Sequence, residues 1–142
     1  MGIAKIIGKA LGLVILVGVI LFGMIQLVPY GRDHTNPPVV QEPNWDAQTR
    51  AIAQKACFDC HSNETVWPWY SNLAPLSWLI QRDVDEGRRY LNFSEWGRWE
   101  VDEVGEVVVE GEMPPAQYFV LHPEAKLTNA EKQTLIQAFG RQ

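Results

Sequence analysis

The pentapeptide Cys57-Phe58-Asp59-Cys60-His61 constrains this chain more than any other feature. In a helical segment, positions 57, 60 and 61 stand at i, i+3 and i+4, so the three side chains share one face. Two thiols on that face can reach two vinyl groups at one edge of a porphyrin, and the imidazole can reach its iron. C-x-x-C-H is the attachment signature of haem c, and no other cysteine competes for this role. The motif predicts one covalent haem, held by Cys57 and Cys60, with His61 as an axial ligand of the iron.

Other uses of the two cysteines fit the sequence less well. A structural zinc site needs four ligands, usually from two paired clusters, and the only further histidines are His34 and His122. A thioredoxin-like pair follows a strand, whereas the residues before Cys57 have a helical pattern. A disulfide would leave His61 without a role. These alternatives stay open at this point.

The N-terminal segment bounds the location of the protein. Lys5 and Lys9 precede an uncharged stretch from Ala10 to Gly31. As a helix this stretch is roughly 33 Å long, enough to cross a bilayer core of about 30 Å. It is longer than the apolar core of a signal peptide, about 7–15 residues, although a long cleaved signal sequence is the alternative. Basic residues before the span favour a cytoplasmic N-terminus, so we expect a single-pass inner (cytoplasmic) membrane protein with residues 33–142 in the periplasm.

The chain divides into three predicted parts: an anchor at 1–31, a proline-containing tether at 32–44 and a haem c-binding domain at 45–142. Prolines in the tether favour extended, semi-rigid chain, with a disordered connector as the alternative. The formal charge of the chain is −5, and without the two anchor lysines residues 32–142 carry −7. This acidity argues against nucleic-acid binding. It reflects either ordinary solubility or the attraction of a basic partner.

Apolar periodicity and capping residues predict an all-α domain. Asn44 or Asp46 can cap the first helix, and Asn72 can cap the second. Thr128 and Glu131 form a capping box for the last helix, which Gly140 should end. Val107–Val109 is also compatible with a short strand. The expected helices run over about 46–61, 72–90, 94–110 and 129–139.

A second axial ligand is expected from the loop around Met113. Met1 and Met24 lie in the anchor, so Met113 is the only methionine in the exported part. It is followed by two prolines, and a stiff loop lowers the cost of ordering a weak thioether ligand. The alternative is an ordinary gap-filling core residue. His122 is the next candidate ligand, and His34 in the tether is weaker.

Aromatic residues are abundant for one small domain, with six tryptophans in the chain. Most of them are expected to pack in the core. Arginines at 82, 88, 89 and 98 can pair with haem propionates, although surface ion pairs are the simpler expectation. The candidates for lining the haem pocket are Trp67, Trp69, Tyr70 and Pro114.

Five segments together resemble the bacterial haem-binding domain family, which comprises small membrane-anchored proteins similar to c-type cytochromes. The resemblance covers most of the exported part and implies covalent haem c, His61 as the proximal ligand and Met113 as the distal ligand. The family implies haem binding but no particular reaction partner. The matching segments are Cys57-Phe58-Asp59-Cys60-His61-Ser62-Asn63-Glu64-Thr65, Trp67-Pro68-Trp69-Tyr70, Ala74-Pro75-Leu76-Ser77-Trp78, Leu91-Asn92-Phe93-Ser94-Glu95-Trp96 and Gly111-Glu112-Met113-Pro114-Pro115.

We therefore expect a small cytochrome c-like helical haem domain on an N-terminal transmembrane helix. By fold-level analogy, its first and last helices should pack across each other beside the haem. The expected function is one-electron transfer with a redox partner protein that the sequence does not identify, rather than enzymatic catalysis. The alternatives are a haem-based gas or redox sensor and a peroxidase-like haem protein. Both need an exchangeable distal ligand.

Overall fold

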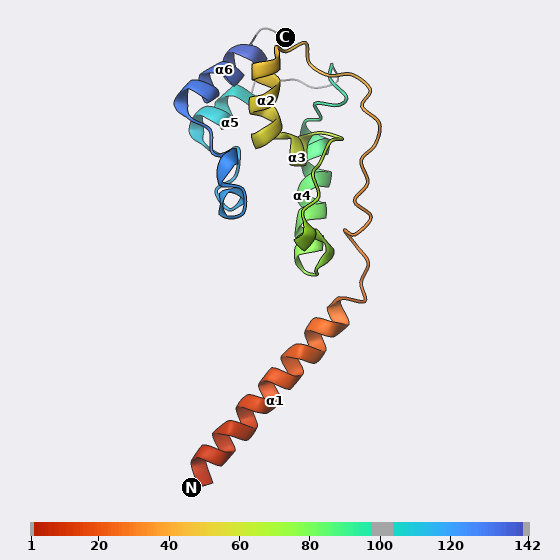
Figure 1. Ribbon diagram of the computed structural model, residues 1–142, viewed down its shortest axis with the longest axis vertical. Coiled ribbons are helices and arrows are strands. Elements are labelled where there is room, and N and C mark those ends of the chain that lie inside the picture. The colour runs from red at the N-terminus through yellow and green to blue at the C-terminus, as the bar shows by residue number, and fades with distance from the viewer. Residues whose placement is uncertain (1, 98–103, 141–142) are drawn as a thin grey trace. The chain divides into compact units, whose positions relative to one another are not determined.

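The computed structural model describes residues 2–97 and 104–140 (Figure 1). Within these residues the protein is all-helical, with six α-helices, three 3₁₀ helices and no strand. The expected fold class is therefore confirmed. The chain forms two compact units, one of Met1–His34 and Pro68–Arg82 and the other of Thr35–Trp67 and Asp83–Gln142. Each unit is described by itself below.

Helix α1 (Gly2–Ile25) fills most of the first unit and is long and apolar enough to cross a membrane. None of its side chains is buried. The helix begins before Lys5 and ends earlier than expected, because turns replace it between Gln26 and Gly31. Pro29 explains this end, since proline disfavours helix at the preceding residue and cannot donate a backbone hydrogen bond.

The rest of the first unit contains the 3₁₀ helix η1 (Trp69–Asn72) and the first half of α4 (Leu76–Tyr90). The expected cap at Asn72 is wrong. Its side-chain amide donates to the carbonyl of Trp69, and α4 begins only after Pro75. Proline suits the first turn of a helix because its missing N–H is not needed there.

The second unit begins with chain that was expected to be a tether. Residues 35–41 are extended, as predicted, but they form hydrogen bonds with other segments of the second unit. The side chain of Asn36 donates to the carbonyl of Thr65, and the backbone amide of Val40 donates to the carbonyl of Ser94. A single bridge joins Gln41 to Glu95.

Two short helices replace the expected first helix. Helix α2 (Ala47–Ala56) is capped by Asp46, whose carboxylate accepts from the amide of Thr49 at 2.8 Å. Cys57 leaves helical geometry at φ −128°, and α3 (Phe58–His61) follows as a separate turn. The expectation of one continuous helix is therefore wrong at the first cysteine.

Helices α5 (Val104–Glu110) and α6 (Asn129–Phe139) complete the second unit (Figure 1). Ser94 lies in a turn and does not open a helix, while residues 98–103 of the expected third helix, with Arg98 and Trp99, lie outside the described residues. Residues 107–109 are helical, so the strand alternative is wrong. Gly111 follows α5 with φ +79°, the left-handed geometry expected of a terminator. The capping box of Thr128 and Glu131 is present.

The 3₁₀ helices η2 (Tyr118–Val120) and η3 (Pro123–Ala125) lie between α5 and α6. Helix α2 packs against α6, and α6 packs against α5. The expectation that the first and last helices of the domain pack against each other is confirmed.

The core of the second unit is built largely from aromatic rings. Phe93 lies at its centre, with ring centroids of Trp45 and Phe58 each 5.3 Å away and that of Trp96 5.9 Å away. Phe139 of α6 adds a further stacked ring. Cys57 packs against this cluster, so the apolar core reaches the first residue of the C-x-x-C-H motif.

Candidate functional site

The C-x-x-C-H motif folds into a single tight turn. The amides of Cys60 and His61 both donate to the carbonyl of Cys57, at 3.2 Å and 2.9 Å. These i+3 and i+4 bonds are the local helical turn that the spacing required. The two cysteines and the histidine therefore come from one turn, although that turn is not a continuation of α2.

His61 is held in a defined orientation and protonation state. Its Nδ1 lies 3.1 Å from the carbonyl oxygen of Leu91. A carbonyl only accepts, so Nδ1 carries the proton and Nε2 keeps a free lone pair, the usual arrangement of a metal-ligating imidazole. Burial lowers the pKa of His61, while the carbonyls of Leu91 and Gly87 oppose the shift. The ring is therefore neutral at pH 7 and able to act as a ligand.

The two thiols are free and half-buried. Burial, with the neighbouring Cys60, raises the pKa of Cys57 to about 12, and burial with Asp59 and Asp83 raises the pKa of Cys60 to about 12. Reactive redox cysteines have a lowered pKa, so these thiols do not resemble a thioredoxin-like pair.

A zinc site is also disfavoured by the arrangement of side chains. Throughout residues 2–97 and 104–140, no group of three or more His, Cys, Asp or Glu side chains is placed to hold a metal ion. A structural zinc site needs four such ligands, and its cysteines bind as thiolates. The raised pKa values of Cys57 and Cys60 oppose that form.

Gly87 lets α4 lie directly against the motif. A Cβ at this position would be 2.8 Å from the carbonyl carbon of Cys60 and 3.0 Å from its Cβ, and nearer still to its carbonyl oxygen. Any larger residue would push the turn and the helix apart. Sequence reasoning missed this glycine because only the contact between two distant segments reveals its role.

A buried network of hydrogen bonds fixes the residues that follow the motif. The Asn63 amide N–H and the side chain of Ser94 are 2.9 Å apart, and Asn92 donates to the side chain of Asn63 at 2.9 Å. Ser62 donates to the carbonyl of Phe58. These residues belong to two of the segments that carry the family resemblance, and their role in the structure is to hold two loops together.

Arg88 completes this framework from α4. Its guanidinium donates to the carbonyls of Ser62 and Thr35 and to the side chains of Asn36 and Thr65, at 2.8–3.0 Å. These bonds tie α4 to the segments around residues 35–36 and 62–65, and pairing of Arg88 with a haem propionate stays a prediction. Five donors in a rigid fork suit this bridging position.

Tyr118 ties the C-terminal loop to the motif itself. Its hydroxyl donates to the Asp59 carboxylate at 2.5 Å, and the other oxygen of that carboxylate accepts from the amide of Val66 at 2.9 Å. Asp59 stands between the two cysteines. No sequence pattern pointed to Tyr118, since its partner is far away along the chain.

Met113 lies in a stiff loop at the surface. Its amide donates to the carbonyl of Val107 at 3.2 Å, and the following Pro114 is buried. The methionine is 41% exposed and is not part of the core cluster. The gap-filling role is therefore disfavoured. Ligation by Met113 stays a prediction.

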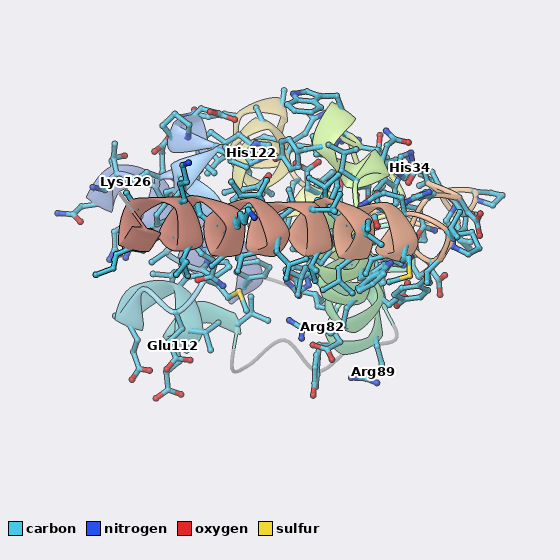
Figure 2. The ribbon with its side chains drawn as sticks, turned by 90° about the horizontal axis from the view of Figure 1, so that it is seen from below. His34, Arg82, Arg89, Glu112, His122 and Lys126 are labelled. Atoms are coloured by element: carbon cyan, nitrogen blue, oxygen red, sulfur yellow. The ribbon has the colours of Figure 1, made fainter. Side chains whose placement is uncertain are left out.

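The other histidines, His34 and His122, are labelled in Figure 2, and each has a protein partner. His34 Nε2 lies 2.9 Å from the hydroxyl of Ser71, within the first unit. His122 stacks on Tyr118 with ring centroids 4.2 Å apart, and its Nδ1 lies 3.3 Å from Glu124. These contacts give both rings a structural role.

The four predicted pocket residues are divided between the two units. Trp67 and Pro114 belong to the unit that contains the motif. Trp67 is half-buried, and its indole donates to Asn36 at 3.2 Å. Trp69 and Tyr70 belong to the other unit and contact each other edge to face. Their places in a haem pocket stay predictions.

The residues present fit a haem. Two neutral thiols and an imidazole with a free Nε2 project from one turn, the core reaches Cys57, and a glycine keeps α4 close. A family model described as haem-binding domain matches residues 20–140. The chain belongs to the haem-binding domain family. Searches of curated proteins and of solved structures gave no match.

Membership makes this haem-binding domain a haem protein. The family match spans both the C-x-x-C-H turn and the Met113 loop. It also includes the end of α1, so the match is not limited to the second unit. The mode of attachment and the distal ligand are matters for the proposal below.

Proposed function

We propose that this protein is a membrane-anchored monohaem c-type cytochrome that transfers single electrons on the periplasmic face of the inner membrane. The observation that carries the proposal is the C-x-x-C-H turn. Cys57, Cys60 and His61 share one turn, and the Nδ1–H of His61 is taken by the Leu91 carbonyl. This donor set matches covalent haem c with a proximal histidine.

Each residue of the site has a defined task in this proposal. The thiols of Cys57 and Cys60 would become two thioether links, which their neutral form supports. His61 Nε2 would be the proximal ligand of the iron and Met113 the distal ligand. When bound, haem supplies an iron that alternates between ferric and ferrous states, and Met/His ligation favours a high potential. The fixed ring of His61 and the stiff Met113 loop would change little between the two states.

The location follows from α1. Lys5 and Lys9 precede the apolar part of the helix and would stay in the cytoplasm. The remaining chain would then be exported to the compartment where haem c is attached. Its partners would be redox proteins of that compartment or the same membrane.

The test is the mass of the purified protein together with its pyridine haemochrome spectrum. We expect the mass of the polypeptide plus one haem, and this haem should stay attached when the protein is denatured. The pyridine haemochrome spectrum should be that of a haem with two thioether links. A colourless protein with the mass of its amino acids alone would refute the proposal. If denaturation releases the haem, the protein would still be a haem protein, but the c-type assignment would be wrong.

Met113 is 41% exposed, and this exposure supports a second candidate function. An accessible distal ligand suits a gas or redox sensor, or a peroxidase-like protein, in which the sixth position is exchangeable. Rapid binding of carbon monoxide by the ferrous wild-type protein would favour these alternatives. A near-infrared sulfur-to-iron band in the ferric protein, with slow carbon monoxide binding, would favour the electron carrier.

A further inference from the structure

The first unit exposes a group of large apolar side chains outside α1. Trp69 is 76% exposed, and three leucines of the same segment are between 40% and 46% exposed. They come from η1 and from the start of α4. We call this group the Trp69 patch, and its members are Trp69, Leu73, Leu76 and Leu79. Large exposed apolar side chains that lie close together in sequence indicate a candidate interaction or membrane-binding site.

The patch is tied directly to the outer end of α1. Gln26, the first residue after the helix, donates to the carbonyl of Ala74 at 2.9 Å, and its side-chain oxygen accepts from the amide of Ala74 at 3.0 Å. Arg32 then donates to the backbone and side chain of Gln26.

Charge changes abruptly along α4. Residues 68–82 contain no acid, and Arg82 is their only charged residue, in a chain with 17 acidic residues. Asp83, Asp85 and Glu86 follow immediately. An acidic surface is repelled by anionic lipid, whereas an apolar segment ending in arginine suits a phospholipid interface.

The helix register separates the patch from the packed side of α4. Leu76 and Leu79 are spaced by three residues and so lie along one side of α4, whereas Leu73 precedes the helix. Ser77, on the other side, is fully buried and leaves no room for a Cβ at Gly31. Leu76 and Leu79 therefore keep more than 40% of their surface exposed on the side away from Ser77.

We propose that the Trp69 patch inserts into the outer interface of the membrane that α1 crosses. Trp69 would lie at the level of the lipid headgroups, where tryptophan is enriched, and the leucines would reach the upper acyl chains. Val28 and Tyr30, which follow α1, are also exposed. The inference rests on the membrane anchoring proposed above, and not on the haem chemistry.

Lipid photo-crosslinking tests this inference. The haem-loaded full chain carries p-benzoylphenylalanine in place of one residue and is reconstituted in vesicles of phosphatidylcholine and phosphatidylglycerol. Trp69 is the test position, and Leu16, exposed in α1, reports whether the anchor is inserted. Tyr90 is the matched control, because it is 73% exposed and lies at the opposite end of α4. The haem content of each variant confirms folding.

We expect lipid adducts at positions 16 and 69, with a yield at 69 several-fold above that at 90. Adducts at 16 but not at 69 would overturn the inference and leave the anchor intact. Equal yields at 69 and 90 would also overturn it, and an adduct at 69 to protein would point to a protein partner instead. No adduct at 16 would refute the anchoring on which the inference rests.

Discussion

Gly87 shows how one missing side chain shapes the haem turn. A Cβ would meet the backbone of Cys60, which cannot move without shifting the turn. We expect Gly87→Ala to lower the free energy of unfolding by about 1–3 kcal/mol, the usual cost of overpacking. It should also lower the yield of covalent haem, since both cysteines must face the porphyrin. Denaturant unfolding and pyridine haemochrome assays measure the two effects.

Gly105→Ala is the matched control within α5. Its new Cβ would lie 3.8 Å from Ile136, an ordinary contact, and helix propensity favours alanine by about 0.5–1 kcal/mol. We expect unchanged haem content and stability that is unchanged or higher. If Gly87→Ala behaves like Gly105→Ala, the close approach of α4 to the motif is not important.

Met113 is the residue on which the electron-carrier proposal depends. We expect Met113→Ala to abolish the near-infrared sulfur-to-iron band, to speed carbon monoxide binding and to lower the reduction potential. The physical reason is that a thioether stabilises the ferrous state, and axial ligands set haem potentials over roughly 0.8 V. Voltammetry and ferric spectra measure the change.

Met24→Ala is the control, because it removes an exposed methionine from α1, which contains no residue of the C-x-x-C-H motif. It should leave both the spectrum and the potential at their wild-type values. An identical spectrum and potential for Met113→Ala would remove this residue from the site and direct attention to His122.

At the scale of elements, an ion pair joins α2 to α6. Lys55 Nζ lies 2.5 Å from the Glu131 carboxylate. The Lys55 hydrogen bond, with those of Thr128, lowers the pKa of Glu131 from 4.5 to about 2. A lowered pKa stabilises the fold above the unfolded value, and this contribution is lost as the pH falls from 4.5 towards 2. Both side chains are partly exposed, so we expect about 1 kcal/mol or less.

Glu131→Gln tests this pair, since glutamine preserves the capping box. The free energy of unfolding should fall at pH 7 and match the wild-type value near pH 2, so the variant should depend less on pH in this range. Glu110→Gln, an exposed carboxylate of α5, is the control and should keep the wild-type slope. If Glu131→Gln keeps the wild-type pH dependence of the free energy of unfolding, the Lys55–Glu131 pair is not the source of that dependence.

Local signals predicted the elements that depend on neighbours in sequence. The Thr128 capping box, the terminator Gly111 and the C-x-x-C-H turn were all found where local chemistry placed them. The first helix is not continuous at Cys57, which leaves helical geometry and packs against the aromatic core. Asn72 found its partner in Trp69 instead of capping α4. At Cys57 a local helical preference competes with a tertiary contact, whereas at Asn72 two local uses of one side chain compete.

The site could be predicted only as far as its motif extends. Cys57, Cys60 and His61 were identified from spacing, but their supports lie in other segments. The Leu91 carbonyl, Gly87 and Tyr118 each act through a contact with the motif that is distant in sequence. A single sequence contains no local signal for such contacts, so only the folded chain reveals them.

At the scale of the molecule, residues 32–142 carry a formal charge of −7, which Lys5 and Lys9 of α1 reduce to −5 for the whole chain. If this charge steers partners, ionic strength should act in opposite directions on small redox reagents of opposite charge. Electron transfer with cationic hexaammineruthenium should slow as salt rises, and transfer with anionic ferricyanide should accelerate. Raising ionic strength from 0.01 M to 0.1 M shortens the screening length from about 30 Å to 10 Å, which stopped-flow kinetics can follow.

Replacing three acidic residues around α5 by glutamine tests which charges matter. Glu106 and Glu110 are exposed in α5, and Figure 2 shows Glu112 beside its C-terminal end. The triple variant loses three negative charges, so both salt dependences should flatten without a change in the haem spectrum. Flat salt dependence in the wild-type protein would mean that its acidity serves solubility alone. A steep dependence that the variant retains would place the steering charges elsewhere on the domain, because charges beyond a screening length contribute little to the encounter.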